Sequence, residues 1–294
     1  MSKKLNYHSI NIEIQVINNV LNNKMNYDQN YKHWDSLSNS GKKHIAHFYL
    51  EKPAIFSISK LAIENTQHKI KNILFLGCGS GGEINQFLET FPNLKDVENI
   101  IGIDNSFELI KIAKDNYPKY NFFYGDLENL DQVIGSFCRE FNIKFDFIFS
   151  SLTLHYIEDW LDLFVQIKKL SKKKSPFVFS THHPVKWGSE SQKNKEFTQF
   201  KMGYKKNKTN NQIEYEIYGD YLTPRAVSET LFGKIDIIHY HKPIGEMINV
   251  FIESGLEIKK VLEPLPILAA KSEKPDFWAV HSKIPLFILF WLVI

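Results

Sequence analysis

The sequence predicts an α/β domain built on a mostly parallel sheet with helices on both faces. From residue 70 onward, short runs that are apolar throughout alternate with stretches whose apolar residues recur at helical spacing. Strands that are buried on both faces read as continuous apolar runs, which is typical of a parallel sheet between two helix layers. The chain has 294 residues, 43% of them hydrophobic, which is enough apolar material for such a core.

The alternation places the elements in order along the chain. The expected strands are 73–76, 100–104, 121–124, 145–150 and 177–180. The expected helices are 83–91, 106–114, one starting near Leu127, and 160–170. Pro92 ends the first of these helices, and the side chain of Ser106 can cap the second. A helix at 244–254, stopped by Gly255, and strands at 256–262 and from residue 286 complete the domain.

Two regions fall outside this alternation, the N-terminal extension and the interval at 184–243. Residues 1–24 are Asn-rich and weakly helical, and residues 55–63 form an apolar helix with Pro53 in its first turn. Residues 184–243 are polar and irregular, with two hairpin-like pieces at 213–222 and 235–241 and a lysine-rich stretch at 201–208 that we expect to be a solvated loop. Long insertions in α/β domains are usually functional, so this one is expected to form a lid over a pocket.

Composition and charge argue against several classes of protein. The net charge is only +3, and Arg139 and Arg225 are the only arginines. Proteins that bind nucleic acid more often carry a strong basic excess and several arginines, so the composition argues against a nucleic-acid partner. Two cysteines, Cys78 and Cys138, cannot form a disulfide framework or a cysteine-based zinc site. No run reaches the roughly 18 apolar residues of a membrane span, and the first residues lack a signal-peptide pattern. We therefore expect a cytoplasmic enzyme.

A glycine-rich loop follows the first expected strand and opens a helix. Gly77, Gly79 and Gly81 form a G-x-G-x-G pattern, and Gly82 also completes G-x-G-x-x-G. Glycines let the backbone turn tightly and approach a ligand, while the helix N-terminus offers free N–H groups. A dinucleotide site and a plain tight turn are both compatible with the loop alone.

Acidic residues end the next two strands. Asp104 ends the second strand, where a carboxylate can accept hydrogen bonds from both hydroxyls of a ribose. Asp126 ends the third strand and can accept from the exocyclic amine of an adenine, or it can cap the helix that starts near Leu127. The loop and the two acids together indicate a cofactor that contains a nucleoside.

With these motifs in this order, the chain resembles the class I S-adenosylmethionine-dependent methyltransferases, in particular the small-molecule type that includes the ubiquinone and menaquinone methyltransferases. The matching motifs are ILFLGCGSG at 73–81, IIGIDNS at 100–106, GDLENL at 125–130, FDFIFSSLTLHYIEDW at 145–160, FVFSTHHP at 177–184 and the segment at 239–266. The resemblance covers roughly residues 45–290. It implies a Rossmann-like seven-stranded sheet whose last strand, at 286–293, is antiparallel to the others.

The resemblance also implies a function and a set of site residues. The protein would transfer a methyl group from S-adenosylmethionine to a small-molecule acceptor, at O, N or C. Residues 69–294 would form the cofactor-binding domain, with the insertion at 184–243, and the helical extension at 1–68 would form part of the acceptor pocket. The cofactor would contact Gly77, Cys78, Gly79, Gly81, Asp104, Asn105, Asp126, Leu127 and Ser151.

One position departs from the family pattern. The family usually has an acidic residue two positions before the first loop glycine, and this chain has Phe75 there. That acid normally helps to organise the amino-acid end of the cofactor, and Glu83, just past the loop, is a candidate to compensate for it. A non-catalytic relative that binds the cofactor is therefore one alternative. A nicotinamide-dependent oxidoreductase is another, although no Tyr-x-x-x-Lys constellation is readable.

Histidines after the fourth and fifth strands are the candidate catalytic bases. Transfer of a methyl group to a neutral O–H or N–H acceptor needs a route for the proton, and histidine can accept one near neutral pH. His155 follows the fourth strand and His183 follows the fifth. A packing role for His155 and a turn role for His183 are the alternatives. His239 and His241 share one face of a strand, but no third ligand is readable, so no metal site is predicted.

Overall fold

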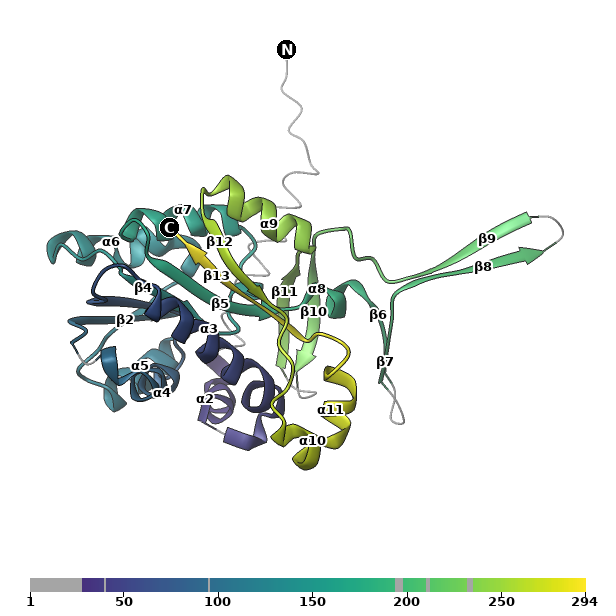
Figure 1. Ribbon diagram of the computed structural model, residues 1–294, viewed down its shortest axis with the longest axis horizontal. Coiled ribbons are helices and arrows are strands. Elements are labelled where there is room, and N and C mark those ends of the chain that lie inside the picture. The colour runs from purple at the N-terminus through teal and green to yellow at the C-terminus, as the bar shows by residue number, and fades with distance from the viewer. Residues whose placement is uncertain (1–27, 40, 95, 194–197, 210–211, 232–234) are drawn as a thin grey trace, which may run out of the picture.

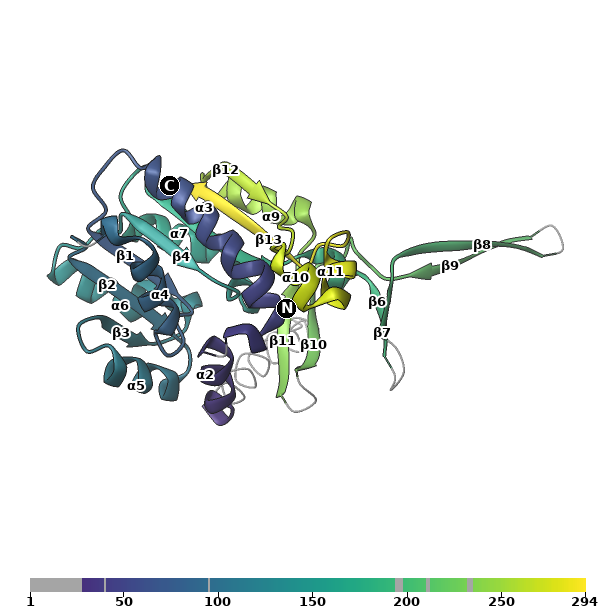
Figure 2. The ribbon, with the colours of Figure 1, turned by 60° about the horizontal axis from the view of Figure 1, so that its bottom comes forward.

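A seven-stranded sheet forms the centre of the protein (Figures 1 and 2). The structure, a computed structural model, describes residues 28–39, 41–94, 96–193, 198–209, 212–231 and 235–294, so the expected helix within residues 1–24 lies outside the described residues. The strand order is β12-β13-β5-β4-β1-β2-β3. The strands are β1 (Asn72–Leu76), β2 (Asn99–Asp104), β3 (Asn121–Tyr124), β4 (Phe147–Ser150), β5 (Pro176–His182), β12 (Glu257–Leu262) and β13 (Phe287–Val293).

The direction of the strands confirms the architecture expected from the sequence. Strands β1 to β5 pair with one another in parallel. Strand β13 inserts between β5 and β12 and is antiparallel to both. The apolar C-terminal segment is therefore an interior strand of the sheet, next to the edge strand β12 and buried along most of its length. Among the described residues, no helix has both the length and the apolar character that crossing a membrane requires.

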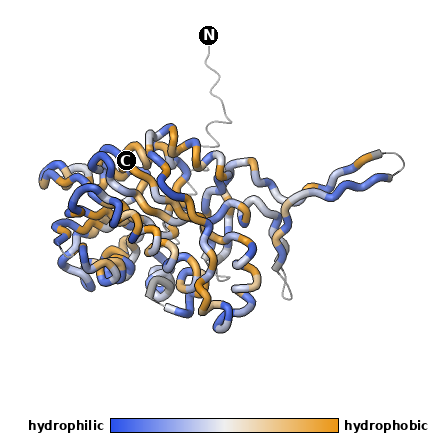
Figure 3. The backbone as a smooth tube through the Cα atoms, in the orientation of Figure 1, coloured by the Kyte–Doolittle hydropathy of each residue, from blue (hydrophilic) through white to orange (hydrophobic). Residues whose placement is uncertain are grey.

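Helices cover both faces of the sheet (Figure 2). Side chains alternate between the faces of a strand, so Leu74 and Leu76 pack into one core and Ile73 and Phe75 into the other. The first core includes α6 (Leu130–Glu140), α7 (Trp160–Leu170) and α9 (Ile244–Glu253). The second includes α3 (Lys52–Glu64), α4 (Gly82–Thr90) and α5 (Phe107–Asn116). Figure 3 shows the apolar segments gathered in the body around these strands.

Short elements connect this framework. They are α2 (Tyr31–Asn39), α8 (Pro184–Gly188), α10 (Ala269–Glu273), α11 (Pro275–His281), the 3₁₀ turns η1 (Gly41–Lys43), η3 (Pro92–Leu94), η4 (Leu127–Asn129) and η5 (Leu154–Tyr156), and the π-helix η2 (His47–Glu51). Ser106 caps α5 as expected, because its Oγ accepts a hydrogen bond from the Leu109 N–H at 3.2 Å. The π-helix was not expected, and it leads directly into α3.

The insertion is built from three hairpins. The pairs are β6 (Glu190–Lys193) with β7 (Thr198–Lys201), β8 (Gly203–Thr209) with β9 (Gln212–Tyr218), and β10 (Arg225–Leu231) with β11 (Ile235–His241). The expectation of a solvated loop at 201–208 was wrong. Lys205 faces Glu216 across the β8–β9 pair, and such opposite charges favour strand pairing. The β8–β9 hairpin projects away from the body, whereas β10–β11 lies against it (Figure 1).

Phe75 is part of an aromatic layer on the face covered by α3, α4 and α5. The Phe75 side chain is 2% exposed, and its ring centroid lies 5.5 Å from those of both Phe87 and Phe149. Tilted and edge-to-face ring pairs of this kind add to the free energy of burial. The residue that replaces the expected acid is therefore a core residue.

Replacing Phe75 tests this packing role. We expect Phe75→Ala to lower the free energy of unfolding by about 3–5 kcal/mol, because it removes a buried ring and leaves a cavity. Phe141→Ala is the control, since Phe141 is 58% exposed, and it should cost less than about 1 kcal/mol. Urea unfolding followed by circular dichroism measures both. Equal losses for the two variants would contradict the packing role.

Candidate active site

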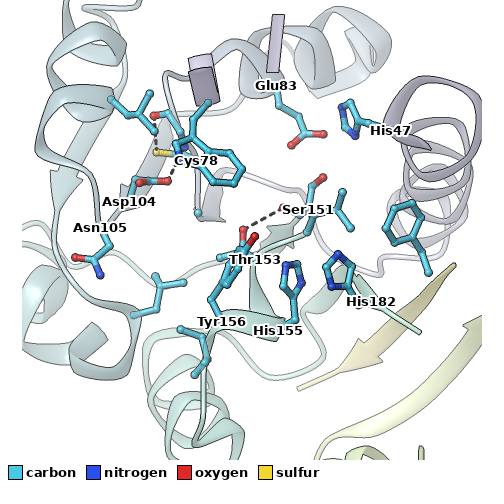
Figure 4. A pocket seen from close by; sticks show the side chains of 18 of the residues that line it. His47, Cys78, Glu83, Asp104, Asn105, Ser151, Thr153, His155, Tyr156 and His182 are labelled. Atoms are coloured by element: carbon cyan, nitrogen blue, oxygen red, sulfur yellow. Dashed lines mark hydrogen bonds between the residues drawn. The ribbon is translucent and has the colours of Figure 1, made fainter. Parts of the chain in front are cut away.

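A cavity of about 380 Å³ opens at the carboxyl ends of strands β1 to β4 (Figure 4). Ligands bind at this edge in open α/β sheets, because the connecting loops converge there. The loops after these strands line the cavity, and so do residues of the N-terminal extension and of the insertion. From the extension come Trp34, His44, Ala46 and His47, and from the insertion come Lys186, Glu229 and Tyr240. All of the expected cofactor residues line this cavity except Gly81.

The loop after β1 has the backbone conformation that glycine allows. Gly77 has φ +70°, and a Cβ atom there would lie 2.1 Å from the Thr153 Oγ1. No other residue fits without moving the loop after β4. Gly81 has φ +83° and precedes α4 as its N-cap, packed beside Tyr117 and Phe122. Gly81 therefore shapes the turn rather than the cavity wall.

The Asp104 carboxylate fixes the glycine loop. Its Oδ2 accepts a hydrogen bond from the Gly79 N–H at 2.8 Å, and its Oδ1 accepts one from the Ser106 N–H at 2.9 Å. Burial raises the pKa of Asp104, against the lowering effect of these hydrogen bonds. Each carboxylate oxygen has a further lone pair, so Asp104 can still accept from a ligand in the cavity.

Asp126 has the capping role that the sequence left open, and it also lies at the cavity. Its Oδ1 accepts a hydrogen bond from the Glu128 N–H at 3.0 Å, so it caps η4. The same residue lines the cavity beside Leu127. The capping bond orients the side chain, and the cavity exposes it to a ligand.

Two histidines form one end of the cavity. The rings of His155 and His182 are stacked, with centroids 3.9 Å apart and planes at 16°. Burial lowers the pKa of both well below the usual 6.5, and nearby His239 and Lys186 add to the effect. Both rings are therefore neutral near pH 7. In the described part of the chain, the Nδ1 atoms of both are buried without a hydrogen-bond partner.

His183 lies off the cavity, unlike His155. Its Nδ1 accepts a hydrogen bond from the Val185 N–H at 3.2 Å, and its Nε2 lies 2.7 Å from the Glu263 Oε1. Strand β5 continues to His182, two residues beyond the expected end. Because side chains alternate along a strand, His182 faces the cavity and His183 faces away from it. Sequence reasoning missed His182 because it misjudged where this strand ends.

Of the other two histidines of interest, His241 is hydrogen-bonded, whereas both ring nitrogens of His239 are buried without a partner among the described residues. The ring centroids of His239 and Trp187 lie 3.9 Å apart. His241 Nε2 lies 2.8 Å from the carbonyl oxygen of Tyr221. Among the described residues, the group that could hold a metal ion by its geometry is a different one, formed by His47, Glu51 and Glu83.

Glu51 is the centre of this second polar cluster. It is fully buried, and its Oε1 accepts hydrogen bonds from the Ser151 Oγ at 3.0 Å and the Ser180 Oγ at 2.5 Å. Its Oε2 accepts one from the His47 Nδ1 at 2.7 Å. The π-helix η2 contains both His47 and Glu51, and such helical irregularities are frequent at functional sites. The pattern at 25–68 gave no signal for a buried carboxylate.

Glu83 faces this cluster from the first turn of α4 (Figure 4). Its Oε1 is buried and has no hydrogen-bond partner among the described residues. Burial and the charge of Glu51 raise the pKa of Glu83 to about 7, against the lowering effect of His47 and Lys52. Burial alone would lower the pKa of His47, but the hydrogen bond and charge of Glu51 outweigh it, so the pKa is raised. The cluster is thus rich in negative charge when Glu83 is ionised.

Comparison with known proteins identifies the family. The methyltransferase domain family matches residues 67–266. This chain belongs to that family. With the seven-stranded fold, the match makes it a class I methyltransferase that uses S-adenosylmethionine.

Several individual proteins are similar to this methyltransferase. An uncharacterised protein of Haemophilus influenzae is 26% identical over 218 residues, which cover 74% of this chain and 76% of that protein. A malonyl-[acyl-carrier protein] O-methyltransferase of Ilyobacter polytropus is 33% identical over 113 residues, but these cover only 37% of each chain. The crystal structure of an S-adenosylmethionine-dependent methyltransferase from Mesorhizobium loti has a TM-score of 0.60 and 22% identity, covering 86% of this chain and all of that one.

The residues around the cavity fit S-adenosylmethionine as a ligand. The glycine loop leads into the N-terminus of α4, and Asp104 and Asp126 are acceptors at the ends of the next two strands. A ligand with a ribose, an adenine and an ammonium group matches this set of acceptors. The Oε1 of Glu83 is a buried acceptor to which no described residue donates a hydrogen bond, so a ligand can supply the donor.

Glu83 also gives the ligand-free methyltransferase a characteristic pH dependence. In the unfolded chain Glu83 ionises near its ordinary pKa of 4.5, and in the folded protein near 7. Its contribution to stability is therefore complete below pH 4.5 and is lost as pH rises to 7. At pH 8 we expect Glu83→Gln to raise the free energy of unfolding by on the order of 1–3 kcal/mol, and below pH 4.5 to change it little.

Chemical unfolding of the ligand-free protein between pH 4 and pH 8 measures this effect. Glu89→Gln is the matched control, because Glu89 lies on the same helix and is exposed. A Glu83→Gln variant that is destabilised equally at both ends of the range would contradict a buried, protonatable Glu83.

Proposed function

We propose that this methyltransferase transfers a methyl group from S-adenosylmethionine to an oxygen or nitrogen atom of a small-molecule acceptor. The observation that supports this proposal most directly is the continuity of one cavity. The same cavity is lined by the glycine loop and the strand-end acids and by the neutral pair of His155 and His182. A cofactor and an acceptor can therefore meet inside one enclosure.

In this proposal the cofactor lies along the carboxyl ends of β1, β2 and β3. The backbone of Gly77, Cys78 and Gly79 contacts its methionine and ribose parts, with Gly81 holding the turn. Asp104 and Asn105 accept from the ribose hydroxyls, and Asp126 and Leu127 face the adenine. Ser151, at the end of β4, then lies near the methyl group. All of these residues except Gly81 line the cavity, which supports the assignment.

The acceptor fills the histidine end of the cavity. Phe287 and Leu286 give this end apolar walls, and Lys186, Glu229 and Tyr240 are contributed by the insertion. The Lys186 Nζ and the Glu229 Oε1 lie 3.5 Å apart. Residues of the N-terminal extension, such as Trp34 and His44, line the same cavity, which supports a share for the extension in the acceptor pocket. The volume suits a small molecule.

The histidines define the chemistry of the proposed acceptor. When bound, the cofactor supplies an electrophilic methyl group on a sulfonium. The acceptor lone pair forms the new bond to this methyl carbon, and the electrons of the broken C–S bond stay on sulfur, which leaves S-adenosylhomocysteine. His182, or His155 stacked on it, accepts the O–H or N–H proton because both rings are neutral near pH 7.

A neutral histidine pair favours a protic acceptor over a carboxylate. The similar Ilyobacter protein is named as an O-methyltransferase of malonyl-[acyl-carrier protein]. A carboxylate acceptor carries no proton to remove, whereas an alcohol, phenol or amine does. Two buried imidazoles with unpaired Nδ1 atoms suit the second group.

Formation of S-adenosylhomocysteine from S-adenosylmethionine, with a panel of hydroxyl, amine and carboxylate acceptors, tests the proposal. With the acceptor that reacts best, we expect His182→Asn to lower kcat by about 10²–10⁴-fold, because the proton acceptor is removed. The Kd for S-adenosylmethionine should change less than about threefold, because His182 makes none of the proposed contacts to the cofactor.

His183→Asn is the matched control, because His183 is adjacent but lies off the cavity and caps α8. It should keep kcat within about threefold. Reaction of carboxylates alone, or equal loss of activity in both variants, would overturn the role of the histidine pair. Failure of S-adenosylmethionine to bind at millimolar concentration would overturn the whole proposal.

A further inference from the structure

The carboxylates near the glycine loop have too few positive partners within their own cluster. Glu51 and Glu83 face one imidazole, that of His47, and two serine hydroxyls. Lys52 acts on Glu83 only through its charge, and its Nζ lies 5.7 Å from the ring centroid of Phe56. With Glu83 ionised and His47 protonated, the cluster keeps one uncompensated negative charge. A buried charge of this kind is costly unless a cation joins it.

Glu83 is the member of the cluster that is open to a ligand. The Glu51 carboxylate is already occupied by three hydrogen bonds, from His47, Ser151 and Ser180. The Oε1 of Glu83 has none in the part of the protein that the structure describes, although it is buried. Figure 4 shows the Glu83 carboxylate pointing into the cavity, next to His47 and above Ser151. The Oε1 atom is therefore an acceptor without a donor, whereas Ser151 hydrogen-bonds to the same carboxylate.

An ammonium group fits this position better than a metal ion. The His47 Nδ1 and the Glu51 Oε2 lie 2.7 Å apart, which is a hydrogen-bond distance with a shared proton. Two ligand atoms held by one tetrahedral ion at bond lengths near 2.0 Å are about 3.3 Å apart. An ammonium group instead brings three N–H donors and a single positive charge, which matches one carboxylate with an unpaired oxygen.

The position along the chain shows which end of the cofactor lies here. Glu83 directly follows the glycine loop, at the first turn of α4, whereas Asp126 lies two strands away at the end of β3. We infer that Glu83, supported by Ser151, Glu51 and His47, forms the subsite for the α-ammonium group of S-adenosylmethionine. This inference rests on the proposed function, since it assigns residues to one end of the same cofactor.

The assignment also accounts for Phe75. The Phe75 ring packs against Phe87 and Phe149 and does not line the cavity, so it offers nothing to a cation. Glu83 places a carboxylate at the cavity from the other side of the glycine loop. In this assignment the carboxylate stands at the start of α4, and Phe75 near the end of β1 belongs to the core.

Calorimetric titration of the intact protein with three ligands tests the inference. S-adenosylmethionine and S-adenosylhomocysteine carry the ammonium group, and methylthioadenosine lacks the whole amino-acid end. We expect Glu83→Gln to weaken the first two ligands at least tenfold and to leave methylthioadenosine within twofold. Glu89→Gln, on the same helix and exposed, should change none of the three.

The outcomes separate this inference from the proposed function. If the unaltered protein binds none of the three ligands, the proposed function fails. If it binds them and Glu83→Gln weakens all three equally, or none, the subsite is wrong while the function stands. Titration with Mn²⁺ and with Zn²⁺ in the absence of cofactor tests whether the cluster binds a metal ion instead. Binding that Glu83→Gln abolishes would overturn the ammonium subsite in favour of a metal site.

Discussion

The shape of the active site depends on the hydrogen bonds of one carboxylate. Asp104 accepts from the N–H of Gly79 in the glycine loop and from the N–H of Ser106 at the start of α5. These two bonds join the ends of β1 and β2, which are neighbours in the sheet. The contact between Gly77 and Thr153 adds the loop after β4 to the same unit. The loops that line the cavity are thereby held in one arrangement before any ligand binds.

This preorganised site contains polar groups that the fold leaves unpaired. The Oε1 of Glu83 and the Nδ1 atoms of His155 and His182 are buried without partners among the described residues. Each such group costs roughly 1–3 kcal/mol in a folded protein. Their concentration around one cavity indicates that this cost is offset by ligands. The Glu83 carboxylate suits the cationic cofactor, and the neutral imidazoles suit a proton to be removed.

The sequence predicted the elements whose pattern is local. Helix α7 at Trp160–Leu170 and the cap at Ser106 agree with expectation, because apolar spacing and capping residues act within a few positions. The glycine loop and the strand-end acids line one cavity because the topology of a parallel sheet brings strand ends together. The role of His182 was missed because a strand boundary two residues off reverses the face of a side chain.

Other features depended on contacts between distant parts of the chain. Glu51 lies in an aromatic and polar stretch, and only its bonds to Ser151 and Ser180 show that it is buried. The hairpins of the insertion depend on cross-strand pairs such as Lys205 with Glu216. Glu51 leaves no periodic signal in the sequence, and the hairpin-like pieces expected at 213–222 and 235–241 contain only one strand each, β9 and β11, of hairpins whose partner strands were missed. The exchange of an acid for Phe75 and the candidate role of Glu83 were readable, but the buried cluster around Glu83 became visible only once Glu83 and Glu51 were placed around one space.

In the proposed complex, one cavity holds the cofactor with its amino-acid end at Glu83 and its adenine at Asp126. A crystal structure of the protein saturated with S-adenosylhomocysteine tests this arrangement. We expect the ligand nitrogen within about 3 Å of a Glu83 carboxylate oxygen and the adenine beside Asp126 and Leu127. A ligand bound in the reverse direction, or with its amino-acid end beside His182, would contradict it.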